Sequence, residues 1–268
     1  MAGGVGVMIR DVVKAFTAGA GRLLVLDGVS LSCRPGEFVS VLGPSGAGKT
    51  TLLRLIAGLD RPQGGEVAIV DGSRRRLDRT AIRLGMVFQE PRLLPWASLF
   101  HNVRYGLQDR AKSMSRAERE RAVQEALELL GLSGFSSYLP HQVSGGMAQR
   151  AALARALVSD PDLLLLDEPL GSLDVKNRLA VQDLLDGMAG RRSCIMVTQS
   201  IDEAVYLSDR IYILSERPAS VVAEIEVSLP RPRDRLSAGF ARCQRRVLEA
   251  LGAAPRPRRP GPDLKVEG

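Results

Sequence analysis

The sequence lacks the features that mark secreted, membrane-spanning and metal-binding proteins. No apolar run approaches the about 18 residues that a membrane span requires, and no basic region followed by a long apolar stretch marks a secretion signal at the N-terminus. The three cysteines, Cys33, Cys194 and Cys243, lie far apart and have no metal-ligand spacing, so we expect free thiols that pack as small apolar side chains. We therefore expect a cytoplasmic chain without a membrane span or a disulfide framework.

Aromatic residues are also scarce, and the body of the chain has little net charge. Aromatics make up 4% of the 268 residues, which leaves few side chains on which nucleic-acid bases could stack. The net charge of +7 is concentrated at the end: residues 231–268 carry ten basic and four acidic residues, whereas residues 1–230 carry 27 and 26. Such a basic end is typical of a solvated tail or of contact with anionic lipid headgroups. We therefore expect no nucleic-acid partner.

The sequence does contain strands that alternate with helices. Unbroken apolar or β-rich runs predict strands, apolar residues at helical spacing predict helices, and capping boxes predict helix starts. Alternation of this kind predicts an α/β fold with a mostly parallel sheet. Strands are expected within residues 23–33, 37–43, 66–72, 84–89, 162–169, 195–197 and 210–214, and we expect the last of these to be the final strand. Helices are expected within residues 51–59, 116–132 and 145–158 and after residue 200. Capping boxes are expected at Ser115/Glu118 and Ser200/Glu203.

The stretch GPSGAGKT, residues 43–50, lies between a predicted strand and a predicted helix and fits the phosphate-binding motif G-x-x-x-x-G-K-[ST]. Its glycines let backbone N–H groups converge on phosphate oxygens, and the positive end of the helix points at the same anion. The ammonium of Lys49 can reach the β and γ phosphates, and the hydroxyl of Thr50 can ligate Mg²⁺. The residues expected to bind the nucleotide here are Gly43, Pro44, Ser45, Gly46, Ala47, Gly48, Lys49, Thr50 and Thr51.

Two adjacent carboxylates follow a second apolar run, DLLLLDEP at residues 162–169. Asp167 stands at the end of a predicted buried strand, where an ionised carboxylate is costly without a cation partner. Mg²⁺ would supply that partner, so we predict Asp167 as a metal ligand together with Thr50. Glu168 could orient and deprotonate a water molecule that attacks the γ phosphate, so we predict it as the catalytic base.

Further motifs in the expected order make the chain resemble the ABC-type ATPases over about residues 8–250. VSGGMAQR at 143–150 resembles the signature motif of that family, and LGSLD at 170–174 resembles its D-loop. Gln89 stands at the place of the Q-loop glutamine, and Phe16 at the place of an aromatic residue that stacks on adenine. The resemblance implies that the nucleotide is ATP, that Phe16 and Gln89 contact it, and that Gln89 also reaches Mg²⁺.

The resemblance also implies a homodimer in which each subunit completes the ATP site of the other. In such a dimer Ser144, Gly145, Gly146 and Asp174 of one subunit face the ATP held by Lys49 of its partner. The residue types agree with this implication, because a hydroxyl and two glycines ahead of a helix form a second anion-binding surface in the same chain. Head-to-tail pairing of this kind gives a two-fold dimer with isologous contacts.

The fold implied by the resemblance is a P-loop NTPase core with a mostly parallel sheet, an N-terminal antiparallel β-subdomain and an inserted helical subdomain. We predict an ABC-type ATPase domain at residues 1–230, with the helical subdomain at about 90–155. A C-terminal helical extension is expected at 231–251. The basic, Pro/Arg-rich residues 252–268 are expected to be disordered.

Two segments resemble one branch of the family, the ATPase subunits of nitrate/sulfonate/taurine-type importers. They are RLLPWASLFHNVRYGL at 92–107 and SERPASVVAEIEVSLPRPRDR at 215–235. The branch implies transmembrane permease subunits, an extracytoplasmic solute-binding protein and a peripheral location at the cytoplasmic face of the bacterial inner membrane. Trp96 and residues 93–95 are candidate permease contacts, and a core position in the helical subdomain is the alternative for Trp96. A soluble ABC-type ATPase acting on DNA or ribosomes is a rival, but tandem ATPase units and coiled-coil insertions are absent from the sequence.

Gln199 departs from the family pattern. It follows a predicted strand at the place where the family usually has a histidine that contacts the γ phosphate and helps to hold the attacking water. The only histidines, His101 and His141, lie elsewhere. An amide keeps a donor and an acceptor but cannot carry charge or transfer a proton. We predict Gln199 as a catalytic residue that supports slow hydrolysis with Glu168 as the base; the alternative is a nucleotide-gated dimer with very weak or no hydrolysis.

Overall fold

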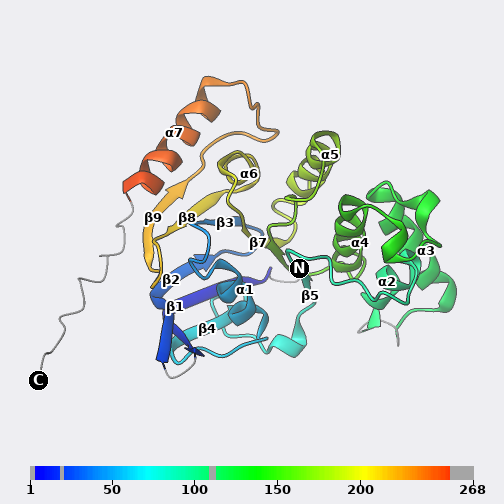
Figure 1. Ribbon diagram of the computed structural model, residues 1–268, viewed down its shortest axis with the longest axis horizontal. Helices are drawn as coiled ribbons and strands as arrows, with labels where there is room; N and C mark the ends of the chain where they lie inside the picture. Colours follow the sequence, from blue (N-terminus) through cyan, green and yellow to red (C-terminus); the bar gives the residue numbers. More distant parts are fainter. Residues whose placement is uncertain (1–3, 19–20, 109–112, 254–268) are drawn as a thin grey trace, which may run out of the picture.

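The computed structural model describes residues 4–18, 21–108 and 113–253, in which two β-sheets are combined with helices (Figure 1). The larger sheet has the strand order β5-β6-β7-β3-β8-β9; β9 is antiparallel to β8 and the other neighbours are parallel. Strands β3, β6, β7 and β8 are buried at every residue, as expected for a parallel sheet covered on both faces. The α/β fold is confirmed, with strands at Leu84–Val87 (β5), Leu163–Asp167 (β6), Ser193–Val197 (β7), Phe38–Leu42 (β3), Arg210–Leu214 (β8) and Val221–Glu226 (β9).

The N-terminal antiparallel sheet is also present, in the order β2-β1-β4. Its strands are Gly6–Ala18 (β1), Gly21–Cys33 (β2) and Gly64–Val70 (β4). Helix α1 (Lys49–Ala57) packs against β4 on one side and β6 and β7 on the other, so Leu52 and Ile56 are fully buried. Burial of each such side chain stabilises the fold by about 1.5–3 kcal/mol. This packing fixes the first turn of α1, where the phosphate-binding motif ends.

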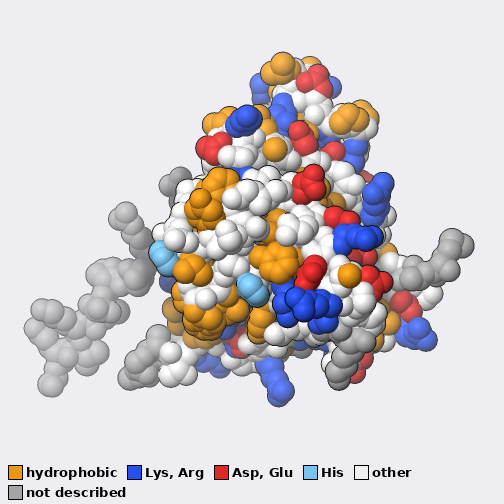
Figure 2. Space-filling view, turned by 90° about the vertical axis from the view of Figure 1, so that its right-hand side faces the viewer, with side chains coloured by type: hydrophobic (Ala, Val, Ile, Leu, Met, Phe, Trp, Pro, Cys, Tyr) orange, Lys and Arg blue, Asp and Glu red, His pale blue; other side chains and the backbone are white. Residues whose placement is uncertain are grey.

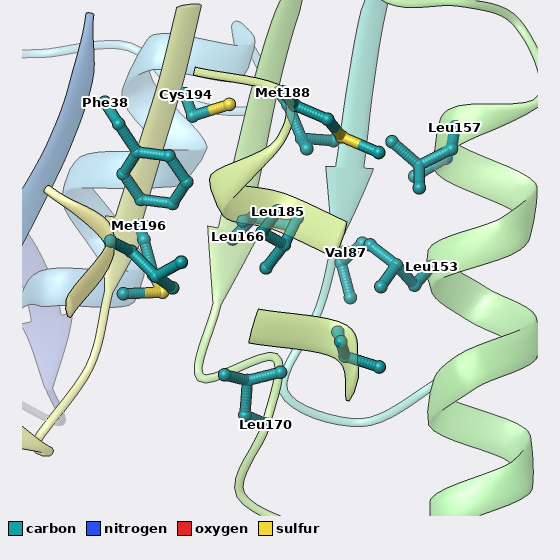
Figure 3. Packing of buried hydrophobic residues seen from close by; sticks show 14 of the residues in the cluster. Phe38, Val87, Leu153, Leu157, Leu166, Leu170, Leu185, Met188, Cys194 and Met196 are labelled. Carbon is teal, nitrogen blue, oxygen red and sulfur yellow. The ribbon is translucent and has the colours of Figure 1, made fainter. Parts of the chain in front are cut away.

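Helices α2 (Leu99–Tyr105), α3 (Arg116–Leu129) and α4 (Gly145–Leu157) form a separate group on the right of Figure 1, within the predicted helical subdomain. The predicted capping box at the start of α3 is confirmed: Ser115 and Glu118 bond each other's backbone N–H groups. Helix α4 joins the group to the main sheet, because Leu153 packs beside Val87 of β5 (Figure 3). Short 3-10 helices lie at Arg79–Ala81 (η1), Ser133–Phe135 (η3) and Pro140–Gln142 (η4).

Helices α5 (Val175–Asp186), α6 (Ile201–Leu207) and α7 (Ala238–Ala253) complete the described chain. Leu185 of α5 packs in the same hydrophobic cluster as Leu166 of β6 and Met196 of β7 (Figure 3). Helix α7 lies beside α6 and β9. Across the described residues, none of the helices combines the length and the apolar character needed to cross a membrane.

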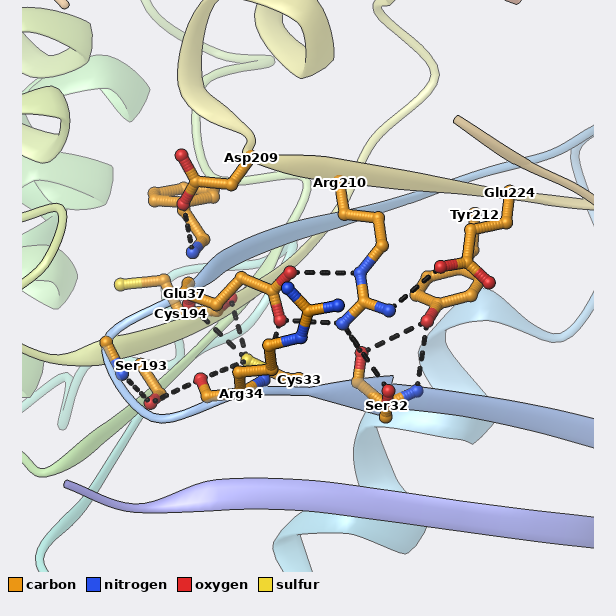
Figure 4. A network of polar contacts seen from close by, with 12 residues as sticks. Ser32, Cys33, Arg34, Glu37, Ser193, Cys194, Asp209, Arg210, Tyr212 and Glu224 are labelled. Atoms are coloured by element: carbon orange, nitrogen blue, oxygen red, sulfur yellow. Dashed lines mark hydrogen bonds and ion pairs between the residues drawn. The ribbon is translucent and has the colours of Figure 1, made fainter. Parts of the chain in front are cut away.

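A buried ion-pair network fixes the start of β3, the strand that leads into the phosphate-binding motif. Arg210 of β8 bonds Glu37 with one guanidinium nitrogen at 2.7 Å and Glu224 with another at 2.8 Å (Figure 4). Asp209 accepts a hydrogen bond of 2.9 Å from the backbone N–H of Phe38, the first residue of β3. Such charged hydrogen bonds stabilise more strongly than neutral ones, so β3 enters the sheet in a fixed register.

The helix predicted within residues 51–59 is confirmed, whereas one prediction about the strands is wrong. The helix begins at Lys49 and ends at Ala57, followed by Gly58 in the left-handed conformation, the residue type that commonly ends a helix. Residues 210–214 do not close the set of strands, because β9 follows. Strand β9 lies at the sheet edge, where residues 221–223 are half-buried and Ile225 is buried.

Two further predictions need correction. The hydroxyl of Ser200 caps α6 by accepting from the N–H of Glu203, but the Glu203 carboxylate accepts from the hydroxyl of Thr198 at 2.8 Å, so the predicted capping box is only half formed. The predicted helix at 231–251 begins only at Ala238, and it includes residues 252 and 253, which we had expected to be disordered. Residues 254–268 lie outside the described part of the chain.

Candidate functional site

The phosphate-binding motif forms a tight loop between β3 and α1. Gly46 and Gly48 have φ angles of 77° and 90°, a region that side chains rarely adopt. A Cβ on Gly48 would also lie 2.6 Å from Cγ1 of Val25, so β2 closes the back of the loop. Ala47 is buried under the loop, Ser45 and Thr50 are exposed, and Gly43 packs its backbone against Leu214 of β8.

Lys49 is buried and its side chain curls over the loop. Its ammonium donates hydrogen bonds of 2.8 Å to the carbonyl oxygens of Gly43 and Pro44. Burial lowers the pKa of Lys49, and the neighbouring carboxylates of Glu168 and Asp167 oppose that effect. The structure therefore places the predicted phosphate ligand beside the predicted acidic pair.

Thr50 and Asp167 come together as predicted. The Thr50 hydroxyl donates to Oδ1 of Asp167 at 3.1 Å, and Asp167 is 2% exposed. Burial raises the pKa of Asp167, whereas the bond from Thr50 and the charge of Lys49 lower it. A hydroxyl and a carboxylate are the hard oxygen donors that Mg²⁺ prefers. No group of three or more His, Cys, Asp or Glu side chains suited to a metal exists within the described ranges, so phosphate and water would have to complete an octahedral Mg²⁺ shell.

Glu168 lies between two amide side chains. Nε2 of Gln199 donates to Oε1 of Glu168 at 2.8 Å, and Nε2 of Gln89 approaches Oε2 at 3.5 Å. These side chains follow β7, β6 and β5, and the carboxyl ends of three neighbouring parallel strands meet at one sheet edge. The backbone of Glu168 has φ 45°, and its N–H donates to the carbonyl of Val197 at 2.9 Å. The carboxylate is thus held by donors that carry no charge.

The second anion-binding surface lies at the start of α4. Ser144 is its N-cap and accepts from the N–H of Met147 at 3.3 Å, which leaves the N–H groups of Gly145 and Gly146 in the first turn. Asp174 is the N-cap of α5; hydrogen bonds from Asn177 lower its pKa. A Cβ on Gly146 would lie 3.2 Å from the carbonyl of Ser172, so the two motifs are neighbours.

The two anion-binding surfaces are not joined within one chain. Among the hydrogen bonds of the described residues, none connects residues 144–146 or Asp174 to residues 43–51. The two predicted half-sites, one at the start of α1 and one at the start of α4, therefore have no direct hydrogen bond to each other in the described part of a single subunit.

Phe16 lies on β1, paired with Leu23 of β2, and is 38% exposed. The ammonium of Lys14 lies 4.8 Å from the centre of its ring. Val25, which also lies on β2, contacts Gly48, so the Phe16 ring lies on the sheet that borders the phosphate-binding loop. Its predicted adenine contact stays a prediction.

Sequence reasoning missed two side chains that tie the Gln89 loop to α4. Buried Gln149 donates to the carbonyl of Phe88 at 3.2 Å, and Arg155 donates to the carbonyls of Pro91 and Arg92 at 2.9 and 2.8 Å. These bonds link the loop after β5 to the helix that begins at Ser144. Both residues stand in a helical pattern that gives no signal of a loop partner.

Comparison with known proteins agrees with this geometry. The sequence pattern of the family described as "ABC transporter" matches residues 26–171. An aliphatic sulfonates import ATP-binding protein of Xanthomonas axonopodis is 46% identical over 86% of this chain and 92% of its own length. An uncharacterised ABC transporter ATP-binding protein of Methanocaldococcus jannaschii is 39% identical over 91% of this chain and 90% of its own.

A solved structure extends the match to three dimensions. It is described as the dimeric, post-hydrolysis state of an ATP-binding cassette bound to ADP and Pi. It has 33% sequence identity and a TM-score of 0.74, and the match covers 82% of this chain and 98% of that one. The chain therefore belongs to the ABC transporter family, as an ATP-binding subunit with ATPase activity of the sulfonate/nitrate importer branch.

Proposed function

We propose that two copies of this chain hydrolyse ATP to energise the uptake of a small anionic solute, of the sulfonate or nitrate class, through a separate transmembrane permease. The observation that carries the hydrolytic part is the placement of Glu168 between two amide donors and next to the Thr50–Asp167 pair. The solute class is supported by relatives that are named for aliphatic sulfonate import.

The first role of the site is to hold the triphosphate. The ammonium of Lys49 and the N–H groups at the start of α1 would bind the β and γ phosphates. Ser144, Gly145 and Gly146 of a second copy would cover the γ phosphate from the other side, with Asp174 beside them. The separation of the two half-sites in one subunit favours this arrangement, because each lacks the other half of a closed pocket.

Thr50, Asp167 and Gln89 would hold Mg²⁺. The ion neutralises phosphate charge when it is bound. The buried Asp167 favours this role, because a carboxylate whose pKa is raised by burial gains most from a cation partner. The exposed amide of Gln89 adds an oxygen donor from the loop after β5.

Glu168 would accept the proton of the attacking water. Gln199 and Gln89 fix the direction of its carboxylate, so the base is already oriented before the nucleotide reacts. Gln199 itself cannot carry charge, and we propose slow hydrolysis on that ground. A nucleotide-gated dimer with very weak hydrolysis is the second candidate, favoured only by this amide.

The permease would contact the helical group formed by α2, α3 and α4. Trp96 is 77% exposed in the loop before α2, so its alternative place in the core is wrong. Figure 2 views the molecule from the side of this helical group, and hydrophobic side chains gather near the centre of that face beside basic ones. We propose Trp96 and residues 93–95 as permease contacts, and thus a peripheral position at the cytoplasmic face of the bacterial inner membrane. An extracytoplasmic solute-binding protein would deliver the solute.

The test is reconstitution of the full chain with its permease and solute-binding protein in liposomes. Uptake of a labelled alkanesulfonate and of nitrate is measured together with phosphate release. We expect ATP-dependent uptake of one anion class, lost in Glu168→Gln and kept in the matched control Glu66→Gln, whose half-exposed carboxylate on β4 pairs with Arg76, away from the helical group. Phosphate release without uptake of either anion would contradict the solute class, and no release at all would contradict hydrolysis.

A further inference from the structure

The segment Arg231-Pro-Arg-Asp-Arg235 connects β9 to α7 and contributes three of the basic residues that the sequence assigns to a solvated end. The structure buries Arg233 and half-buries Arg231 and Arg235. The side chains of Arg231, Arg233 and Arg235 are 23%, 2% and 28% exposed. Their main partners lie on α5 and α6, so the positive charges of this segment bind groups of the protein itself.

Two of the arginines close the carboxyl end of α6. Of the last four carbonyl groups of this helix, that of Ala204 accepts from the N–H of Ser208. The guanidinium of Arg233 donates to the carbonyls of Val205 and Tyr206 at 2.9 Å each. Arg231 donates to the carbonyl of Leu207 at 2.7 Å. All four groups that a helix end leaves without partners are therefore satisfied, three of them by positive charges placed at the negative end of the helix.

The same arginines tie α6 to α5. Arg231 pairs with Asp186 of α5, and Arg235 bonds Gln182 of α5. Besides Arg231, the link between the two helices is thus made by Arg235, whose guanidinium lies 3.4 Å from the centre of the Tyr206 ring, while the Tyr206 hydroxyl donates to Asp183 of α5 at 2.7 Å. Helix α5 follows the D-loop, and α6 follows Gln199. The segment thus joins the two helices that continue from two loops of the nucleotide site.

A second link runs from the segment to β3. Oδ1 of Asp209 accepts from Arg231 at 2.8 Å, while its Oδ2 accepts from the backbone of Phe38. Phe38 begins the strand that ends at the phosphate loop. The position of α6 is therefore set relative to the phosphate loop as well as to α5.

The opposite end of α6 is attached rigidly to Gln199. Thr198 receives a hydrogen bond of 3.0 Å from the N–H of Ser200 and donates to Glu203 at 2.8 Å, so the residues on both sides of Gln199 are bonded to each other and to the first turn. Helix α6 has seven residues, a length of about 10 Å. A shift at its carboxyl end is passed to Gln199 over two turns of hydrogen-bonded backbone.

We propose that Arg233, assisted by Arg231, is a positioning residue for ATP hydrolysis, which holds α6 so that the Gln199 amide stays within hydrogen-bond distance of Glu168. This inference rests on the proposed catalytic role of Gln199. The 2.8 Å bond between Gln199 and Glu168 has little tolerance, because a displacement of about 1 Å of a catalytic group can cost about 100-fold in rate. Burial lowers the pKa of Arg233 to about 10, which still leaves the guanidinium protonated at neutral pH.

The simpler reading is that the segment only anchors α7. Arg233 also lies near Cys243 of α7, but the hydrogen bonds of Arg231 and Arg233 among the described residues go to α6, to the strand end at Val227 and to Asp186 and Asp209. A residue that acts through Gln199 and one that only stabilises the fold also differ in a measurable way. Replacing a residue that acts through Gln199 no longer changes the rate once Gln199 itself has been replaced, whereas replacing a residue that only stabilises the fold changes the rate equally in both backgrounds.

The test is a double-mutant cycle on the turnover of the full chain assembled with its permease. Arg233→Met is made in the native chain and in Gln199→Ala, and kcat and KM for ATP are measured at a temperature well below each melting point. We expect kcat to fall by about 10- to 100-fold in the native chain with KM changed by less than about twofold, and to fall by less than about twofold in Gln199→Ala. Arg233→Lys, which keeps one donor and the charge, should restore part of the rate.

The matched control is Arg79→Met. Arg79 also donates to a carbonyl at a helix end, that of Leu55 in α1 at 3.1 Å, but has no bond to α5 or α6. Its effect on kcat should be the same in both backgrounds. If Arg233→Met does not fold, Arg231→Met enters the same cycle, since its side chain is less buried.

Equal losses of kcat from Arg233→Met in both backgrounds would overturn the inference and leave a structural anchor. A loss confined to KM would overturn it as well. Failure of the underlying function looks different, because Gln199→Ala alone would then leave kcat unchanged, and the positioning role would fall with it.

Discussion

Replacing Gln199 with histidine should accelerate ATP hydrolysis by about tenfold. The amide of Gln199 donates a 2.8 Å hydrogen bond to Glu168 and carries no charge. A protonated imidazole at this place brings a positive charge toward the γ phosphate, so donor and acceptor are both charged, whereas with the amide only the acceptor is charged. The gain of about 1–1.5 kcal/mol corresponds to about tenfold in kcat.

The measurement is phosphate release by the chain assembled with its permease, at saturating ATP and at several pH values. The gain requires protonated imidazole, whose ordinary pKa is about 6.5. It should therefore be larger at pH 6.5 than at pH 8.5. Gln199→Ala is the paired variant: it removes a hydrogen bond to a charged group, worth about 1.5–3 kcal/mol, and should slow kcat by about 10- to 100-fold without a comparable change in KM.

Two results would contradict this role of Gln199. A Gln199→His chain that is slower than the native chain at both pH values would show that the amide suits the site better than a cation. A Gln199→Ala chain with native kcat would show that the bond to Glu168 has no part in the reaction.

The remaining predictions concern binding and stability. Trp96→Ala should abolish co-purification with the permease while changing the unfolding free energy by less than about 0.5 kcal/mol in urea titration, because the side chain is 77% exposed; retained co-purification would contradict the contact. Phe16→Ala should weaken ATP binding by about 0.5–1.5 kcal/mol in calorimetry, whereas an unchanged affinity would exclude ring stacking. Burial raises the pKa of Cys194 to about 12, so above about pH 8.5 only the unfolded thiol ionises. The unfolding free energy should therefore fall by up to about 1.4 kcal/mol per pH unit in that range. Cys194→Ala should reduce this pH dependence, and an identical pH dependence in both chains would contradict the prediction.

The parts of the site that the sequence predicted are those whose chemistry restricts the residue types. The loop at 43–50 needs glycine where φ is positive, and the structure has φ 77° at Gly46 and 90° at Gly48. Asp167 and Glu168 end an unbroken apolar run that forms the fully buried strand β6, between β5 and β7. In such segments the local sequence pattern agrees with the tertiary environment, so the pattern alone is sufficient to predict the site residues.

The parts that the sequence did not predict depend on distant partners or on a choice between neighbouring hydrogen-bond partners. Arginines at 231–235 have the composition of a solvated end, and only the fold reveals carbonyl groups of α6 within their reach. Glu203 has the spacing of a capping box with Ser200, yet its carboxylate accepts a hydrogen bond from the hydroxyl of Thr198 and not from the N–H of Ser200. Strand β9 is recognised by its antiparallel pairing with β8 at the sheet edge. None of these outcomes follows from local spacing.

In the proposed assembly each ATP lies between two copies of this chain. Light scattering of the Glu168→Gln chain, which should bind ATP without hydrolysing it, reports this assembly as a change of mass. We expect the mass of two chains in ATP and of one chain in ADP, with the dimer lost when Ser144→Phe is added. A Glu168→Gln chain that binds ATP tightly and keeps the mass of one chain would contradict it.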